Sequence, residues 1–450
     1  MTHEAPGGGT IGMASWQTRY RDKLVSIDDA LQVIQPGQTV AFGMNGNIPA
    51  GLCHALGKRL PSLPGLHLMG SGALEPLPFH QPDVAAQYSV QDMFLTAATR
   101  PAMKQRSLDF LPFTTALWPS DLLDRSRPLD VFLTSVSPPD EHGYCNFGFM
   151  LWASADLAEA AAVVIAEVDE DHIVTYGDSH IHVSQFDYLV EKPQATVLGD
   201  VTTTMGFASP SDLDRQIAAH ASALIRDGDT LQLGAGTVSM AVVDYLKEKN
   251  DLGLHSEICP TGIPQLIAAG NINGQYKTLN PRKAVCTALW GDEFALDFAH
   301  LNPAIELHRM RYTNNPRIIA QHDNMIAINN ALTIDLTGQV TAESFGPQMY
   351  SGIGGQLDFM IGAQLAKNGR AVTVLPSTAK AGTISRIVPQ HPEGAIVSVP
   401  RTYLNYVVTE YGAVDLLGKS QRERAERLMS IAHPHFRDEL WQAAKVLYWP

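Results

Sequence analysis

An internal repeat limits the possible folds of this chain more than any other feature of its sequence. The segment "ALQVIQPGQTVAFGMNGNIPAGLCHAL" begins at Ala30, and a similar segment, "ASALIRDGDTLQLGAGTVSMAVVDYL", begins at Ala221. Each copy predicts a helix, a turn, a short strand (Val40–Phe42 or Leu231–Leu233), a glycine loop and a second helix. Two copies of such a unit predict two related halves.

A second pair of segments supports this division. "DVFLTSVSPPDEHGYCNFG" ends at Gly148 and "NNALTIDLTGQVTAESFG" ends at Gly346, and each predicts a strand, a polar glycine turn and another strand. Because strands alternate with helical stretches in both halves, we predict an α/β fold of two similar, tandemly repeated domains with mainly parallel sheets. The domains are expected at residues 1–208 and 209–450, joined around Gly199–Asp214.

Composition and charge argue against several classes of protein. The 450 residues are too many for one ordinary core, and 45% of them are hydrophobic, as in soluble globular proteins. The formal charge of −14 and the lack of a basic stripe argue against a nucleic-acid partner, although a few local cations can still bind small anions. The longest apolar run, Ala160–Ala166, is too short to span a bilayer, and the glycine-rich start lacks the features of a signal peptide. We therefore expect a cytoplasmic protein without membrane contact.

The cysteines predict neither a disulfide framework nor a metal site. They are far apart and show no CxxC spacing, so buried thiols in a reducing compartment are the favoured interpretation. Cys259 is close to Glu257 in sequence, but no His/Asn pattern indicates that it is a nucleophile. We expect no metal and no bound cofactor.

The ligand site is expected beyond the carboxyl ends of the strands, where parallel α/β sheets bind their ligands. The loops Gly43–Gly51 and Gly234–Gly236 lie at such ends, and so does Glu257. Amides near Gly234 and Gly236 can cradle a phosphate, but tight strand-to-helix turns explain these glycines equally well. Neither loop matches a dinucleotide fingerprint or a P-loop. The cleft between the two halves is the natural site.

A denser glycine cluster occurs in "QMYSGIGGQLDF". Gly352, Gly354 and Gly355 stand just before a helix-like run, so their amides can form an oxyanion hole or an anion nest. A flexible turn is the other interpretation.

Further candidate residues lie in polar loops of the second half. Asn314 belongs to the turn "YTNNP", and Lys380 and Arg386 belong to "LPSTAKAGTISRIVP", which follows an apolar strand. The basic loop suits an anionic ligand, although a solvated basic loop is commoner. Glu410 ends another apolar strand in "YVVTEYG", again at a ligand-side position.

Glu257 is the main candidate for chemistry. In "DLGLHSEICPTGIPQL" it follows a short apolar strand and precedes the breaks at Pro260 and Gly262. A carboxylate there either caps a helix or takes part in catalysis. Because the chain has no Gly-x-Ser-x-Gly elbow, HExxH or CxxC pair, Glu257 is the best available nucleophile or base.

Taken together, these motifs resemble the acetyl-CoA hydrolase/transferase family, which includes 4-hydroxybutyrate CoA-transferases. The resemblance runs from about Gly228 to Leu440 through "LGAG", "HSE", "YTNNP", "QHDNMIAINNALTIDLTGQV", "YSGIGGQLDF", "LPSTAKAGTISRIVP", "VVTEYG" and "SIAHPHFRDEL". The first half matches more loosely, through its glycine loop and "SPPDEHGYCNFG". The family implies a class I CoA-transferase-like fold with the active site between two similar domains.

The resemblance also implies a mechanism and a set of site residues. Glu257 matches the family glutamate that attacks an acyl-CoA thioester and forms an anhydride and then a glutamyl-CoA thioester. Asn314 and the amide of Gly355 match the oxyanion donors, while Lys380 and Glu410 match further active-site positions. CoA would be a substrate, small carboxylic acids the partners, and a homo-oligomer the expected assembly.

Departures from the family pattern leave alternatives open. "ICPTG" follows Glu257, "TYLN" follows Arg401, and "FTTALWPSDLL" stands in the first half, so the acyl pocket need not be shaped for acetate. An acyl-CoA hydrolase on the same scaffold is the close alternative, since water would then end the reaction. A non-catalytic acyl-CoA-binding protein would be free to lose Glu257, and a nucleotide-dependent oxidoreductase lacks its fingerprint here.

Overall fold

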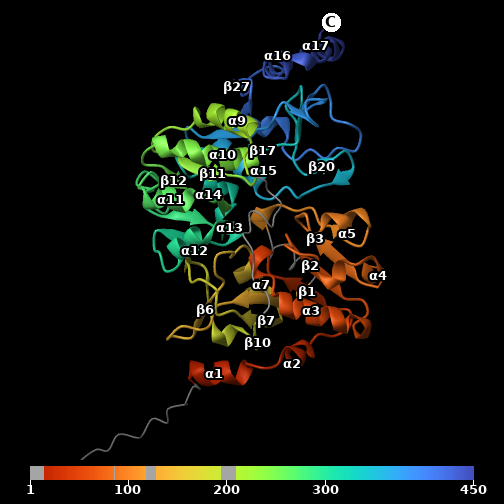
Figure 1. The fold of residues 1–450 in the computed structure, drawn as a ribbon, viewed down its shortest axis with the longest axis vertical. Helices are drawn as coiled ribbons and strands as arrows, with labels where there is room; N and C mark the ends of the chain where they lie inside the picture. The colour runs from red at the N-terminus through yellow and green to blue at the C-terminus, as the bar shows by residue number, and fades with distance from the viewer. Residues whose placement is uncertain (1–14, 86, 118–127, 194–208, 450) are drawn as a thin grey trace, which may run out of the picture.

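The computed structural model describes residues 15–85, 87–117, 128–193 and 209–449. The chain forms two α/β domains, one from each half of the sequence. The N-terminal domain, red to yellow, fills the lower part of Figure 1, and the C-terminal domain, green to blue, fills the upper part. The predicted fold class is confirmed.

The N-terminal domain contains a seven-stranded sheet in the order β10-β7-β5-β1-β2-β3-β4, with every neighbouring pair parallel. In chain order these strands are β1 Thr39–Phe42, β2 His67–Gly70, β3 Ser89–Asp92, β4 Asp109–Phe110, β5 Val131–Val136, β7 Val163–Val168 and β10 Tyr188–Glu191. The helices around it are α1 Trp16–Lys23, α2 Ile27–Leu31, α3 Ala50–Arg59, α4 Pro82–Ala85, α5 Arg100–Lys104 and α7 Ser154–Ala160.

The C-terminal domain contains a six-stranded sheet in the order β12-β11-β17-β22-β26-β27, parallel except for the last pair. Its strands are β11 Thr230–Leu233, β12 Gly253–Leu254, β17 Met325–Asn330, β22 Arg370–Val374, β26 Tyr406–Thr409 and β27 Gly412–Asp415. Its helices are α9 Asp212–Ser222, α10 Thr237–Tyr245, α11 Ile263–Ala268, α12 Glu293–Ala299, α13 Met310–Thr313, α14 Pro316–Ile319, α15 Gln356–Leu365, α16 Gln421–Ser430 and α17 Pro434–Tyr448.

Short strands and 3₁₀ helices connect these elements. The short strands are β6 Tyr144–Asn146, β8 Tyr176–Gly177, β9 His180–His182, β13 Ile258–Cys259, β14 Ala284–Cys286, β15 Ala288–Leu289, β16 Ile305–Leu307, β18 Thr333–Asp335, β19 Val340–Thr341, β20 Ser344–Phe345, β21 Gln348–Met349, β23 Thr378–Ala379, β24 Ile384–Ser385 and β25 Ile387–Val388. The 3₁₀ helices are η1 Asn45–Asn47, η2 Leu60–Ser62, η3 Pro78–His80, η4 Thr115–Leu117, η5 Val183–Gln185, η6 Leu246–Glu248 and η7 Arg401–Tyr403.

The internal repeat corresponds to a repeated topology. The order β2-β1-β5-β7-β10 in the first sheet matches β12-β11-β17-β22-β26 in the second. The strands predicted from the repeat are β1 and β11, and every residue of both is buried. Strands covered on both faces in this way are typical of parallel sheets with helices on each side.

The two copies of the second repeated segment, which end at Gly148 and Gly346, differ in how their strands pair. In the C-terminal domain, β18 and β19 form an antiparallel hairpin across a turn that contains Gly338. In the N-terminal domain, β5 belongs to the main sheet, whereas β6 leaves it and pairs with β9. Similar local patterns therefore lead to different pairings.

The two domains share structure across their boundary. β8, from the first half, adds a parallel strand to β16 of the second half. One hydrophobic cluster includes Phe132 and Phe149 together with Leu231 and Ile258. The expected boundary at 208 adjoins residues 194–208, which lie outside the described residues, and it remains a prediction.

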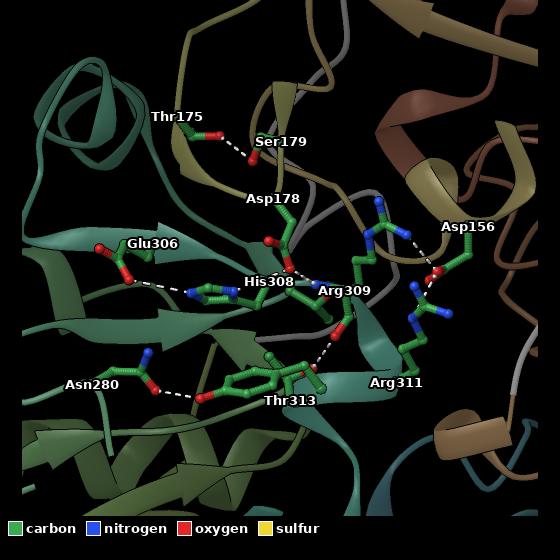
Figure 2. A network of polar contacts seen from close by, with 12 residues as sticks. Asp156, Thr175, Asp178, Ser179, Asn280, Glu306, His308, Arg309, Arg311 and Thr313 are labelled. Atoms are coloured by element: carbon green, nitrogen blue, oxygen red, sulfur yellow. Dashed lines mark hydrogen bonds and ion pairs between the residues drawn. The ribbon is translucent and has the colours of Figure 1, made fainter. Parts of the chain in front are cut away.

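Charged side chains also join the domains, where β16 leads into α13. Figure 2 shows Asp178 facing His308, and Asp156 facing Arg309 and Arg311. Asp178 Oδ2 is 3.1 Å from His308 Nδ1, and Asp156 Oδ1 is 2.9 Å from both Arg309 Nη1 and Arg311 Nε. Because the Asp156 carboxylate is almost fully buried, loss of its arginine partners would be costly. The network fixes the beginning of α13 between the domains.

Candidate active site

A cavity of about 360 Å³ lies between the domains and is lined by residues of both. Its N-terminal wall is largely apolar, with Met44, Phe94, Phe113 and Trp152. Phe113 and Thr115 belong to the segment "FTTALWPSDLL", of which residues 118–127 lie outside the described residues. The C-terminal wall carries Glu257 and the glycine loops. The predicted cleft between the halves is therefore present.

Glu257 lies between β12 and β13, with its side chain at the cavity. Its carbonyl oxygen accepts hydrogen bonds from the amides of Thr287 and Ala288, at 2.9 and 3.1 Å. Its carboxyl Oε2 accepts a hydrogen bond of 3.1 Å from the amide of Gly355. The next helix, α11, begins only at Ile263, so Glu257 does not cap the helix that follows it.

Gly355 stands at the N-terminus of α15, and its lack of a side chain permits this contact. A Cβ at this position would lie 2.8 Å from Glu257 Oε2 and 2.4 Å from Asn314 Nδ2. Both distances are shorter than van der Waals contact, so the carboxyl, the amide and Gly355 can meet only if residue 355 is glycine. The position at the start of a helix also favours a negative charge on Glu257.

Asn314 is fully buried at the end of α13 and hydrogen-bonds Glu257 through its side chain. Its Oδ1 accepts a hydrogen bond of 2.9 Å from Thr313 Oγ1, and its Nδ2 donates one of 2.7 Å to Thr115 Oγ1. Because the Thr115 hydroxyl donates to Asp358, it can only accept from Asn314, which places the amide nitrogen on the side of Thr115 and the oxygen on the side of Thr313.

A second buried carboxylate supports this arrangement from behind. Asp358, in the first turn of α15, accepts hydrogen bonds of 2.7 Å from both Thr114 Oγ1 and Thr115 Oγ1 and one of 3.3 Å from the amide of Ala116. Thr115 therefore donates to Asp358 while it accepts from Asn314. Sequence reasoning missed Thr115 and Asp358, although they stand in the quoted segments "FTTALWPSDLL" and "QMYSGIGGQLDF", because the contact between residues so far apart in the chain leaves no local pattern.

The environment makes Glu257 an unusual carboxyl. Burial raises its pKa from the ordinary 4.5 to about 7, against the lowering effect of the hydrogen bonds from Gly355 and Asn314. The negative charge of Asp358 raises the pKa further. A carboxylate removed from water in this way is more basic than an exposed one and is therefore a better nucleophile.

The structure brings some of the other predicted residues to the cavity. Gly234, Gly236, Gly352 and Gly354 all line it. A Cβ at Gly234 would come within 2.4 Å of Asn329 Oδ1, and one at Gly236 would meet the Asn330 side chain. Close packing alone therefore explains these two glycines, and their role in CoA binding remains a prediction.

Lys380 and Glu410 do not line the cavity. Lys380 is exposed in the turn between β23 and β24. Glu410 accepts hydrogen bonds from the amide and the hydroxyl of Ser377, at 2.9 and 2.5 Å, and so holds the loop next to Pro376, which does line the cavity. Contacts of Lys380 and Glu410 with CoA remain predictions.

Cys259, two residues from Glu257, is buried. Contact with Cys286 and burial raise the pKa of Cys259, which keeps this thiol protonated and weakly nucleophilic. Among the residues that the structure describes, no group of three His, Cys, Asp or Glu side chains is arranged to hold a metal ion. None of the described helices is long and apolar enough to cross a membrane.

A carboxyl withdrawn from bulk water and bound to the start of a helix, in the cleft between two repeated parallel-sheet domains, is the arrangement of a candidate active site in an α/β enzyme. The family models of the acetyl-CoA hydrolase/transferase N-terminal and C-terminal domains match residues 12–198 and 291–444. The chain belongs to the acetyl-CoA hydrolase/transferase family. Glu257 lies between the two matched segments.

Individual relatives match almost the whole chain. The chain is 39% identical to a 4-hydroxybutyrate coenzyme A transferase of Clostridium kluyveri, over 96% of this chain and 99% of that protein. It is 36% identical to a succinyl-CoA:cyclohexane-1-carboxylate CoA transferase of Geobacter metallireducens, over 96% of this chain and 97% of that protein. An acetyl-CoA hydrolase of Yarrowia lipolytica is more distant, at 24% identity over 75% of this chain and 71% of that protein.

Solved structures agree with the fold. The crystal structure of RipA from Yersinia pestis aligns with a TM-score of 0.90 at 33% identity, and covers 97% of this chain and all of that one. A 4-hydroxybutyrate CoA-transferase from Porphyromonas gingivalis aligns with a TM-score of 0.77 at 34% identity, over 96% of this chain and all of that one.

Proposed function

We propose that this enzyme is a CoA-transferase that moves CoA from an acyl-CoA to a carboxylic acid through covalent intermediates on Glu257. One observation carries the proposal: the carboxyl of Glu257 is withdrawn from water at the interdomain cavity and is bound by the amide of Gly355. A carboxylate in water is a sluggish nucleophile, and desolvation makes covalent catalysis by it effective. The similarity to CoA transferases over nearly the full chain supports the same reaction.

The proposed reaction has two halves. The ionised carboxylate of Glu257 attacks the thioester carbonyl carbon, the C–S bond breaks, and CoA leaves as a thiolate with the bonding pair. The thiolate then attacks Cδ of Glu257 in the resulting anhydride, which releases the first acyl group as a carboxylate and leaves a glutamyl-CoA thioester. A second carboxylate reverses these steps and leaves as the new acyl-CoA.

The donors at Glu257 support a specific role in this sequence. Gly355 and Asn314 both donate to the carboxyl of Glu257 itself. They therefore lie beside the oxygen that becomes an oxyanion when the thiolate, and later the CoA-accepting carboxylate, attacks Cδ. A fixed oxyanion donor is typically worth about 3 kcal/mol of transition-state stabilisation. We assign both donors to the tetrahedral intermediates centred on the glutamyl carbon.

Intact-protein mass spectrometry tests the proposal. Wild-type protein and Glu257→Gln are incubated with acetyl-, butyryl- or succinyl-CoA without an acceptor. We expect a gain of one CoA mass in the wild type that disappears when a carboxylate is added, and no gain in the variant. Tight binding without adduct or turnover would instead indicate a binding protein.

A hydrolase remains the second candidate, because the family contains acetyl-CoA hydrolases such as the Yarrowia lipolytica relative. In a hydrolase, water would attack the anhydride or the glutamyl thioester. Steady release of free CoA that an added carboxylate does not accelerate, with no adduct, would favour hydrolysis. The apolar side chains on the N-terminal wall help exclude water and favour transfer.

A further inference from the structure

Two arginines, one from each domain, line the cavity that contains Glu257. Among the described residues of the cavity wall, Arg100 and Arg386 are the only cations, and Glu257 is the only carboxyl. This local excess of positive charge contrasts with the formal charge of −14 of the whole chain. Because the pKa of Glu257 is about 7, the cavity carries net positive charge at neutral pH.

Arg100 begins α5 in the N-terminal domain and is held against the C-terminal domain. Its Nε donates a hydrogen bond of 2.7 Å to the carbonyl of Tyr350. Its guanidinium carbon lies 3.8 Å from the centre of the Tyr350 ring, a cation–π contact. These contacts involve the Nε atom and one face of the Arg100 guanidinium. No described carboxylate forms an ion pair with Arg100.

Arg386 lies between β24 and β25 on the other side of the boundary. Its Nη1 donates a hydrogen bond of 3.1 Å to the carbonyl of Leu332, and its buried Nε has no hydrogen-bond partner among the described residues. Burial lowers the pKa of Arg386, against the opposing effect of the nearby Asp214 carboxylate. Asp214 forms no ion pair with Arg386 and is engaged by the hydroxyl of Thr237.

Both arginines are thus positioned by main-chain carbonyls and not neutralised by carboxylates. Arg386 is partly buried, and a guanidinium withdrawn from water without an acidic partner is costly unless a ligand supplies the missing negative charge. Tyr350 also lines the cavity, and its ring stacks on Arg100. The planar fork of each guanidinium suits the paired oxygens of a carboxylate or a phosphate.

We propose that Arg100 and Arg386 form a subsite for a second anionic group on the substrate, separate from the carboxyl or thioester that reacts at Glu257. The anion is an oxyanion group carried by the same molecule: either a phosphate of CoA or the far carboxylate of a dicarboxylic acyl group. The inference rests on the proposed function, because it assumes that acyl-CoA occupies this cavity. Such a group would also bridge the two domains.

Three thioesters distinguish the sources of the anion: butyryl-CoA, succinyl-CoA and butyryl-pantetheine, which lacks the phosphates. Transfer to acetate is measured for wild type, Arg100→Gln and Arg386→Gln, with Arg317→Gln, an exposed arginine outside the cavity, as the control. If the subsite binds phosphate, each cavity variant raises KM for both CoA thioesters by about tenfold to a hundredfold and leaves butyryl-pantetheine unchanged. If it binds a carboxylate, only succinyl-CoA is affected.

Equal effects on all three thioesters, or no effect on any, would overturn the proposal, because neither depends on a second anion. Arg386→Lys provides a charged alternative if Arg386→Gln fails to fold. Calorimetric titration with desulfo-CoA and with succinate tests the subsite without any transfer. If either probe binds more weakly to the cavity variants, the subsite is supported. If the enzyme at the same time never forms an adduct at Glu257, the proposed reaction is rejected while the subsite stands. Unchanged binding of both probes would reject the subsite alone.

Discussion

At the scale of single residues, the site depends on one absent side chain. Gly355 brings the start of α15 into hydrogen-bond contact with Glu257, and a Cβ there would overlap both Glu257 and Asn314. We expect Gly355→Ala to push the carboxyl away from its donor and to lower kcat by about a hundredfold or more, the usual loss for one oxyanion donor. Steady-state kinetics with butyryl-CoA and acetate measure this effect.

The matched control for this substitution is Gly70→Ala. Gly70 also has a negative φ, and its added Cβ would meet only Phe42, at the ordinary distance of 3.8 Å. Gly70→Ala should leave kcat within a factor of about two, because a substitution that the surrounding structure accommodates has only a small effect. Wild-type kinetics in Gly355→Ala would show that the contact with Glu257 plays no part in turnover.

The pH dependence of the reaction is also expected to follow the ionisation of a single residue. In the proposed reaction Glu257 attacks as a carboxylate, and its pKa is raised to about 7, so kcat/KM should rise with pH and level off above pH 7. Because the negative charge of Asp358 contributes to the raised pKa, Asp358→Asn should move the acidic limb to lower pH. A pH–rate profile from pH 5 to pH 9 for both proteins measures the shift.

A second buried carboxyl serves as the control for this assignment. Burial also raises the pKa of Glu167 to about 7, but its side chain binds the amide of Leu52 and lies outside the cavity wall. Glu167→Gln should leave the acidic limb in place. If the limb disappeared in this variant and stayed fixed in Asp358→Asn, the titrating group would not be Glu257.

At the scale of elements, η4 of the N-terminal domain connects α13 and α15 of the C-terminal domain. Thr115 on η4 accepts from Asn314 and donates to Asp358, with both distances 2.7 Å. Thr115→Val keeps the shape but removes the hydroxyl, so the buried side chains of Asn314 and Asp358 each lose one hydrogen bond. We expect kcat to fall about tenfold or more, because the loss of a hydrogen bond by a buried polar group costs about 1–3 kcal/mol.

Thr115→Ser distinguishes the effect of the hydroxyl from that of the methyl group, because serine keeps the hydroxyl and lacks the methyl group. It keeps both hydrogen bonds and should retain kcat within about threefold, at the cost of a small packing defect. Equal losses in Thr115→Val and Thr115→Ser would show that packing, and not the hydrogen bonds to Asn314 and Asp358, determines the effect.

The elements also show what the sequence can and cannot predict. β1 and β11 were predictable because a short run of mostly apolar residues followed by a glycine loop is a local pattern, and it occurs twice in the chain. The pairing of β8 with β16 was not, because it joins segments far apart in the chain and leaves no local pattern. In the site, Glu257 and Gly355 were recognisable from their motifs, whereas Asp358, in the same segment as Gly355, and Thr115 have roles that arise only from tertiary contact.

At the scale of the whole molecule, the active site exists only because the two repeated halves pack together. The hydrophobic cluster that joins them, the pairing of β8 with β16 and the polar network of Figure 2 all act across this boundary. The network ends at α13, whose C-cap is Asn314. Changes in domain packing should therefore alter the hydrogen bond from Asn314 to Glu257. The ionisable members of the network make this packing sensitive to pH.

His308 provides the test of that sensitivity. Burial alone lowers its pKa, but its contacts with Asp178 at 3.1 Å and Glu306 at 3.2 Å outweigh burial and raise the pKa above the usual 6.5. The resulting stability is fully present below pH 6.5 and is lost as pH rises through the folded-state pKa. We expect His308→Gln to lower the free energy of unfolding by about 1–3 kcal/mol at pH 6 and by little at high pH.

Glu257 would obscure this measurement, because its own raised pKa also removes stability as pH rises through about 7. Denaturant unfolding between pH 5.5 and pH 9 is therefore compared in the Glu257→Gln background, with and without His308→Gln. His54, whose contact with Glu75 is exposed, is the control, and His54→Asn should leave the pH dependence unchanged because exposed ion pairs contribute little. A pH dependence that survives in His308→Gln but disappears in His54→Asn would place the titration at the surface and not between the domains.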